Sequence, residues 1–95
     1  MAKFVLVHGT GCGGWVWKKL APLLSLAGHE VYTPTLTGVG DRSHLLDCGV
    51  DLTTHITDIA SLLWYEDLTD VVLVGHSYAG MVITGVAAQA PARLK

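Results

Sequence analysis

Charged residues are scarce in this chain. Lysine, arginine, aspartate and glutamate make up 15% of its 95 residues, whereas about a quarter is usual. The net charge is −2 and no basic run is present, so nothing supports nucleic-acid binding. A domain of this size is mostly surface, yet 51% of the residues are hydrophobic. This excess predicts faces that are covered by more protein: a second chain, an oligomer or further sequence.

Cysteines and long apolar runs are also few. Cys12 and Cys48 are the only cysteines, and their separation fits no metal-binding or disulfide spacing. No apolar run approaches the roughly 18 residues of a membrane span. The first run, residues 4–7, is too short for the apolar core of a signal peptide. We therefore expect a cytoplasmic protein without a metal, a cofactor or a membrane partner.

Three apolar runs, each followed by a helical pattern, organise the chain. The strands are expected at residues 4–7, 30–33 and 71–74, and the helices at 15–26, about 51–63 and 78–90. This alternation predicts one α/β domain over residues 1–95, a three-layer sandwich with three parallel strands and three helices. Pro22 should kink or restart the first helix, and Asp51 or Thr53 should cap the second. The last helix is apolar nearly all round and is expected to be buried. A sheet this small leaves two open edges, which predicts self-association or pairing with a complementing chain.

Residues 71–80 read Val-Val-Leu-Val-Gly-His-Ser-Tyr-Ala-Gly. A buried strand that turns sharply into a small-residue helix is typical of the nucleophile elbow, Gly-x-Ser-x-Gly. Ala79 stands where the second glycine is expected. The pattern predicts that Ser77 is a nucleophile, and the alternative is a serine that only caps the helix.

A glycine-rich loop follows the first strand, with the sequence His-Gly-Thr-Gly-Cys-Gly-Gly at residues 8–14. It satisfies Gly-x-Gly-x-x-Gly, but a dinucleotide site also needs an acidic residue at the end of the second strand, and that strand ends in Thr33-Pro34. Dinucleotide binding through the Gly9 to Gly14 loop is thus a weak alternative. The better interpretation is an oxyanion hole, formed by the backbone N–H groups of Tyr78 and Thr10.

Three residues of this loop are candidates for substrate contact: Gly9, Gly11 and Cys12. Glycines let a backbone approach a substrate closely because they have no Cβ. Packing is an alternative role for Cys12, because nothing in the sequence would activate its thiol.

A serine nucleophile requires a histidine base, and none of the five histidines fits well. We expect His8 to brace the glycine loop by a hydrogen bond and His76 to support the elbow. His29 should lie at the opposite end of the sheet, and His55 should be solvated or structural. His44, in the long loop 35–50, is the only one that could approach Ser77. The aspartates are better explained as loop, turn and cap residues: Asp41, Asp47, Asp51 and Asp58.

Together, residues 5–15 and 72–80 resemble the N-terminal half of an α/β-hydrolase. The branch is similar to the small bacterial esterases related to plant methyl esterases and hydroxynitrile lyases, and residues 33–45 resemble the loop that the bacterial members carry after the second strand. The resemblance implies the strand order second, first, third. It also implies that the catalytic acid and histidine lie downstream, in a protein more than twice this length. The lyases carry threonine after the loop histidine, where this chain has Gly9, which favours an esterase.

Two functions follow from these expectations. The first is a serine hydrolase that acts on small carboxylic esters through an acyl-enzyme on Ser77, with its base and acid supplied from outside this chain. The second is a catalytically incomplete fragment that acts as an assembly module, through its open sheet edge and its apolar last helix.

Overall fold

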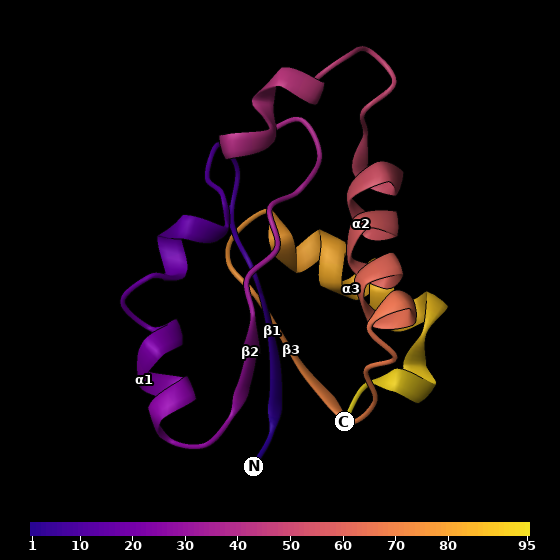
Figure 1. Ribbon diagram of the computed structural model, residues 1–95. Helices are drawn as coiled ribbons and strands as arrows, with labels where there is room; N and C mark the ends of the chain where they lie inside the picture. Colours follow the sequence, from indigo (N-terminus) through magenta and orange to yellow (C-terminus); the bar gives the residue numbers. More distant parts are fainter.

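Strands and helices alternate along the whole chain, and the structure, a computed structural model, describes residues 1–95 (Figure 1). The strands are β1 (Lys3–Val7), β2 (Glu30–Tyr32) and β3 (Val71–Gly75). The α-helices are α1 (Ala21–Leu26), α2 (Leu52–Tyr65) and α3 (Ala79–Gln89). The 3-10 helices are η1 (Gly14–Trp17), η2 (Gly40–Leu45) and η3 (Pro91–Arg93). None of the helices is both long and apolar enough to span a membrane.

The sheet has the order β2-β1-β3, and both strand pairs are parallel. The alternation and the resemblance predicted this arrangement, and it is confirmed. β1 pairs along its full length with β3, and its last three residues are buried. At the outer edge of β3, Leu94 forms an isolated parallel bridge with Val71, and the Lys95 amide donates to the Val71 carbonyl at 2.9 Å.

Helices lie on both sides of the sheet, which gives the predicted three layers. α1 lies on one side, and α2 and α3 lie together on the other (Figure 1). The hydrophobic core fills the space between the sheet and the α2–α3 pair. Its largest fully buried apolar side chains outside β1 are Leu36, Ile59, Leu63, Val71, Val82 and Val86.

The second helix begins where the sequence indicates. Asp51 is its N-cap, and Thr54 donates its backbone N–H to the Asp51 carboxylate at 3.0 Å. In return, the Asp51 amide donates to Thr54 Oγ1 at 3.2 Å, which completes a capping box. α2 buries His55, Ile59 and Leu63 on one face.

The predicted first helix is in fact two short helices. Residues 15–26 do not form one helix, because η1 ends at Trp17 and α1 begins at Ala21. Pro22 lies in the first turn of α1, where a missing N–H is tolerated, so it restarts the helix as predicted. No residue of α1 is buried, and Leu26 is 86% exposed.

The prediction that the last helix is buried all round is wrong. Ala79, Val82 and Val86 are buried, but Met81 is 59% exposed. The main contacts of α3 are with β3, α2 and η3, and they leave Met81 uncovered.

Candidate active site

Ser77 lies in a sharp turn between β3 and α3. Its φ is 58°, in the left-handed region that residues with a side chain rarely adopt. The His76 amide donates to the Val7 carbonyl at 3.1 Å, and the Gly80 amide donates to the Ser77 carbonyl at 2.9 Å. A Cβ on Gly75 would lie 2.9 Å from the Ala79 carbonyl oxygen, so the turn needs a glycine there. Such strain gathers at functional sites, and here it holds an exposed serine at the carboxyl end of the sheet.

Ala79, the departure from the elbow pattern, is accommodated without exposure. It is fully buried at the first position of α3. The Ala79 amide donates to the His76 carbonyl at 3.1 Å. The extra methyl group therefore fits inside the packed turn.

The glycine-rich loop packs directly against this turn. A Cβ on Gly9 would lie 3.0 Å from His76 Nδ1 and 3.3 Å from Ser77 Cβ. Contacts this short leave little room for any side chain at residue 9. The loop backbone therefore lies immediately beside the serine.

Two backbone N–H groups near Ser77 have no acceptor within the chain. The amides of Thr10 and Tyr78 donate no backbone hydrogen bond. Most buried backbone donors in proteins are paired, whereas Thr10 is exposed and Tyr78 is half-buried. One N–H follows Ser77 in the chain, and the other follows Gly9, which packs against it. Both N–H groups are therefore free to donate to an acceptor from outside the chain.

His8 is fully buried at the end of β1 and holds the loop in place. The Leu36 amide donates to His8 Nε2 at 3.0 Å, so this nitrogen carries no proton. The other nitrogen, Nδ1, then carries the proton and donates to the Gly9 carbonyl at 2.8 Å. The ring is neutral in this arrangement, and it links the loop to the segment after β2.

Gly14, at the end of the loop, lies against the segment that follows β2, and Gly40 of that segment lies against the loop. A Cβ on Gly14 would overlap the Thr33 carbonyl oxygen, and one on Gly40 would lie 2.7 Å from the Cys12 carbonyl oxygen. The Gly14 amide also donates to Thr35 Oγ1 at 2.9 Å. Close approach of two backbones therefore accounts for these glycines, without a phosphate group.

A pocket of about 220 Å³ opens beside the glycine loop. Gly9 and Gly11 line it, as does Thr10, whereas Cys12 is half-buried and does not. The other lining residues come from the segment that leaves β1, the segment after β2, α2 and the turn at Ser77: His8, Leu36, Val39, His55 and Tyr78. Leu36, Val39 and His55 were not predicted from the sequence to belong to the site.

The ring of His55 connects Tyr78 to the segment after β2. The Tyr78 hydroxyl lies 2.8 Å from His55 Nδ1, and His55 Nε2 lies 2.9 Å from the Thr37 carbonyl oxygen. Of the two positions expected for His55, solvated or structural, the structure shows the structural one, because the side chain is buried. Burial and, to a smaller extent, the Asp51 carboxylate raise the pKa of Tyr78 above its ordinary value, so the phenol keeps its proton at neutral pH.

Helical spacing could have revealed His55. Residues 52, 55 and 59 lie on one face of a helix, and Leu52 and Ile59 belong to the apolar pattern of α2. A polar ring on an apolar face requires hydrogen-bond partners. The sequence does not show which residues these partners are, because Thr37 lies in a segment without periodicity.

The other histidines form no hydrogen bond with the serine. His76 is exposed, with its ring against Gly9, rather than packed in the interior. His44 is exposed in η2, and His29 lies at the opposite end of the sheet, where Nδ1 accepts the Ala2 amide at 2.9 Å. The histidine rings that form hydrogen bonds are those of His8, His29 and His55, and none of them bonds to Ser77. No group of three His, Cys, Asp or Glu side chains could hold a metal ion.

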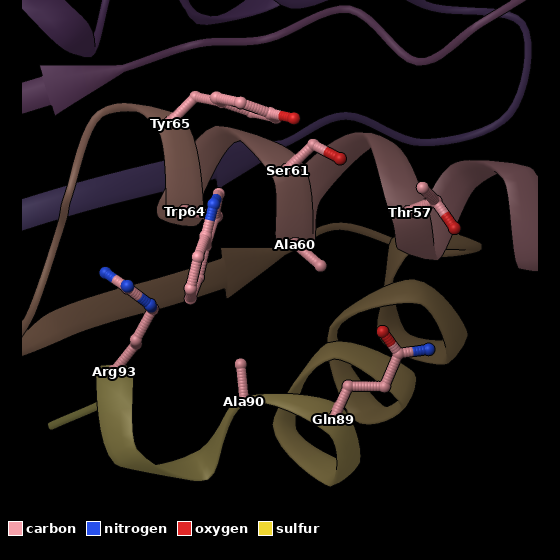
Figure 2. A pocket seen from close by; sticks show the side chains of 8 residues that line it. All are labelled: Thr57, Ala60, Ser61, Trp64, Tyr65, Gln89, Ala90 and Arg93. Carbon is pink, nitrogen blue, oxygen red and sulfur yellow. The ribbon is translucent and has the colours of Figure 1, made fainter.

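A second hollow, of about 380 Å³, lies between α2 and the end of α3 (Figure 2). Its lining contains no residue of the elbow or the glycine loop: Thr57, Ala60, Ser61, Trp64, Tyr65, Gln89, Ala90 and Arg93. The Arg93 guanidinium lies 5.1 Å from the centre of the Trp64 ring and donates to the carbonyls of Leu63 and Leu68. These contacts tie η3 to α2, so the hollow is a feature of helix packing.

Comparisons with known proteins agree with this geometry. The model of the alpha/beta hydrolase family matches residues 4–94. The carbendazim hydrolyzing esterase of Nocardioides sp. (strain SG-4G) is 59% identical over 87 residues, which cover 92% of this chain and 36% of that protein. Methylesterase 1 of Arabidopsis thaliana is 40% identical over 89 residues, covering 82% of this chain and 30% of the relative.

Solved structures share the fold. An extracellular alpha/beta-hydrolase from a Paenibacillus species superposes with a TM-score of 0.91 at 34% identity, over 100% of this chain and 38% of that one. Polyneuridine aldehyde esterase gives a TM-score of 0.88 at 33% identity, over 99% of this chain and 37% of that one. The chain thus spans only 30% to 38% of the lengths of these relatives. It belongs to the alpha/beta hydrolase family.

Proposed function

We propose that this chain carries the nucleophile and the oxyanion hole of a serine esterase, and that it cleaves small carboxylic esters through an acyl-enzyme on Ser77. The observation that supports this most is the exposed Ser77 at a φ of 58°, beside two backbone N–H groups without an acceptor in the chain. The names of the relatives, a carbendazim hydrolyzing esterase and a methylesterase, point the same way.

In this proposal Ser77 Oγ attacks the carbonyl carbon of the ester, and its proton passes to a base. The carbonyl oxygen gains negative charge, and the amides of Tyr78 and Thr10 donate to it. One such donor contributes roughly 3–4 kcal/mol in the transition state. The N-terminal end of α3, which begins at Ala79, adds its positive dipole. The alcohol then leaves, and water hydrolyses the acyl group from Ser77.

The base and the acid are assigned to sequence outside this chain. No histidine ring is hydrogen-bonded to Ser77 within the 95 residues, and the relatives extend well beyond the matched segment. Ser77 in the chain alone should therefore react slowly, and a base from solution should accelerate it.

The test is acetylation of the 95-residue protein by p-nitrophenyl acetate, with and without imidazole as a diffusible base. We expect the intact mass to rise by one acetyl group at Ser77, faster with imidazole. Ser77→Ala controls for direct attack by imidazole and for acetylation of lysines. Equal labelling of Ser77→Ala would contradict the proposal. His44→Gln tests the only loop histidine that could act as a base, and unchanged labelling is the expected result.

A second candidate function is assembly, because the outer edge of β3 is almost unpaired. Beside the single Val71–Leu94 bridge lies an apolar hollow of about 220 Å³, lined by Leu73, Ile83, Thr84, Ala87 and Leu94. Unpaired edges favour strand addition. Sedimentation should then show an oligomer of the 95-residue protein, and a monomer at all concentrations would contradict this function.

A further inference from the structure

Two buried histidines are hydrogen-bonded to neighbouring residues of one segment. His8 accepts the Leu36 amide, and His55 contacts the Thr37 carbonyl. Each ring also reaches one side of the region around Ser77: His8 through the Gly9 carbonyl, and His55 through the Tyr78 hydroxyl. The segment after β2 therefore connects the two proposed donors of the oxyanion hole.

We propose that His55 is a positioning residue for the oxyanion hole, and that it fixes the Tyr78 side of the hole through its hydrogen bonds to Tyr78 and Thr37. This inference rests on the proposed function of Ser77. His55 lies on α2, remote in sequence from the elbow, and it touches Tyr78 and Thr37 rather than the serine.

The partners of His55 define its proton position. The Thr37 carbonyl can only accept, so His55 Nε2 donates to it at 2.9 Å. In the neutral tautomer with this proton, Nδ1 has a free lone pair that accepts from the Tyr78 hydroxyl, 2.8 Å away. This tautomer, with its proton on Nε2, is opposite to that of His8. Because both ring nitrogens are used, the orientation of the imidazole is fixed.

The Thr37 end of this chain of bonds is anchored by α2 itself. Asp58 accepts the Thr37 amide and the Thr37 hydroxyl, each at 2.7 Å and each on a different carboxylate oxygen. His55 and Asp58 are three residues apart on the same helix, so α2 holds Thr37 by its N–H, its carbonyl and its side chain. A rigid helix thus supports the contact with Tyr78.

The Tyr78 ring connects His55 to the backbone of residue 78. Tyr78 precedes α3 with no side-chain cap of its own, and its ring packs edge-on against His55 at 5.6 Å between ring centres. Fixing the hydroxyl fixes the two side-chain torsions, and so constrains the backbone whose N–H faces the site. Small displacements of such groups have large effects on rate.

The test compares Tyr78→Phe and His55→Leu with the double variant. The rate of Ser77 acetylation by p-nitrophenyl acetate with imidazole should fall roughly tenfold in Tyr78→Phe. The double variant should be no slower than His55→Leu, because the Tyr78 hydroxyl acts through the ring that is already absent. Tyr65→Phe is the matched control: it removes a hydroxyl from a tyrosine on α2 that is 84% exposed, and it should leave the rate unchanged. A folded Tyr78→Phe with the wild-type rate would overturn the proposal.

A second measurement separates this proposal from the function of Ser77. In the wild type, ¹⁵N NMR of the His55 ring should show the proton on Nε2, and Tyr78→Phe should shift the Nδ1 signal and the backbone amide signal of residue 78. If Ser77→Ala is acetylated like the wild type, the proposed esterase function fails, and the NMR result still decides the positioning role. An unmoved residue 78 amide overturns that role, even if the rate falls.

Discussion

The two faces of the sheet differ in how they hold their helices. α2 buries three side chains, His55, Ile59 and Leu63, whereas α1 buries none, and its Leu23 and Leu26 are 64% and 86% exposed. Both helices carry apolar residues at helical spacing. The difference shows that an apolar pattern on a helix does not by itself mean that the helix contributes to the core.

The α1 side is attached through contacts of α1 with β2 and through backbone contacts at the start of η1. Gly14 packs against the Thr33 carbonyl, and its amide donates to Thr35 Oγ1. α1 itself has six residues and no side-chain cap, whereas α2 has fourteen and a complete capping box. The α2 face is therefore held by fully buried side chains, whereas the α1 face buries no helix side chain fully and includes a close approach of two loops.

The largest expected effect tests the α2 face. Leu63→Ala removes a fully buried side chain and should lower the free energy of unfolding by about 3 kcal/mol. Leu26→Ala is the matched change on α1, and it should lower it by less than about 0.5 kcal/mol. Urea unfolding of both variants checks this. Equal losses would show that α1 is also part of the core.

The next effect tests the attachment of the other face. Gly14→Ala places a methyl group against the Thr33 carbonyl, so the two loops must separate, and about 2 kcal/mol of stability should be lost. Gly80→Ala is the control, because a Cβ there meets nothing within 4 Å and alanine favours a helix. The same urea experiment distinguishes them. If the Gly14→Ala protein were as stable as the wild type, the contact between the two loops would not contribute to stability.

Sequence patterns predicted the parts of this fold that local chemistry determines. The apolar runs located the strands, and the Gly-His-Ser sequence located the sharp turn at Ser77, because both patterns are contiguous in the chain. The burial of α3 could not be predicted, since periodicity shows which side chains are apolar but not whether another element covers them. His55 and Asp58 were also missed as contacts of Thr37, because their partner lies in a segment whose path depends on tertiary packing.

The smallest expected effect concerns the carboxylate of Asp51, which caps α2, because α1 has no side-chain cap. The hydrogen bonds from the Thr54 amide and hydroxyl lower the pKa of Asp51 below its ordinary value. A carboxyl group whose pKa is lower in the folded state stabilises that state above its unfolded pKa, and this contribution is lost as the pH falls through the folded pKa. As the pH falls from about 5, near the unfolded pKa of aspartate, to below about 3, the first turn of α2 should therefore lose protection against hydrogen exchange.

Asp51→Asn is the control for this effect. Asparagine can still cap the helix, but it does not titrate, so comparison of the two proteins at each pH cancels the intrinsic change in exchange rate. The difference between them should appear at the start of α2 and not in α1, which has no acidic residue in its first turn. If the wild type and Asp51→Asn lost protection in parallel, the cap would not be the origin of the pH dependence. The stronger attachment of α2 at neutral pH would then be due to its buried side chains alone.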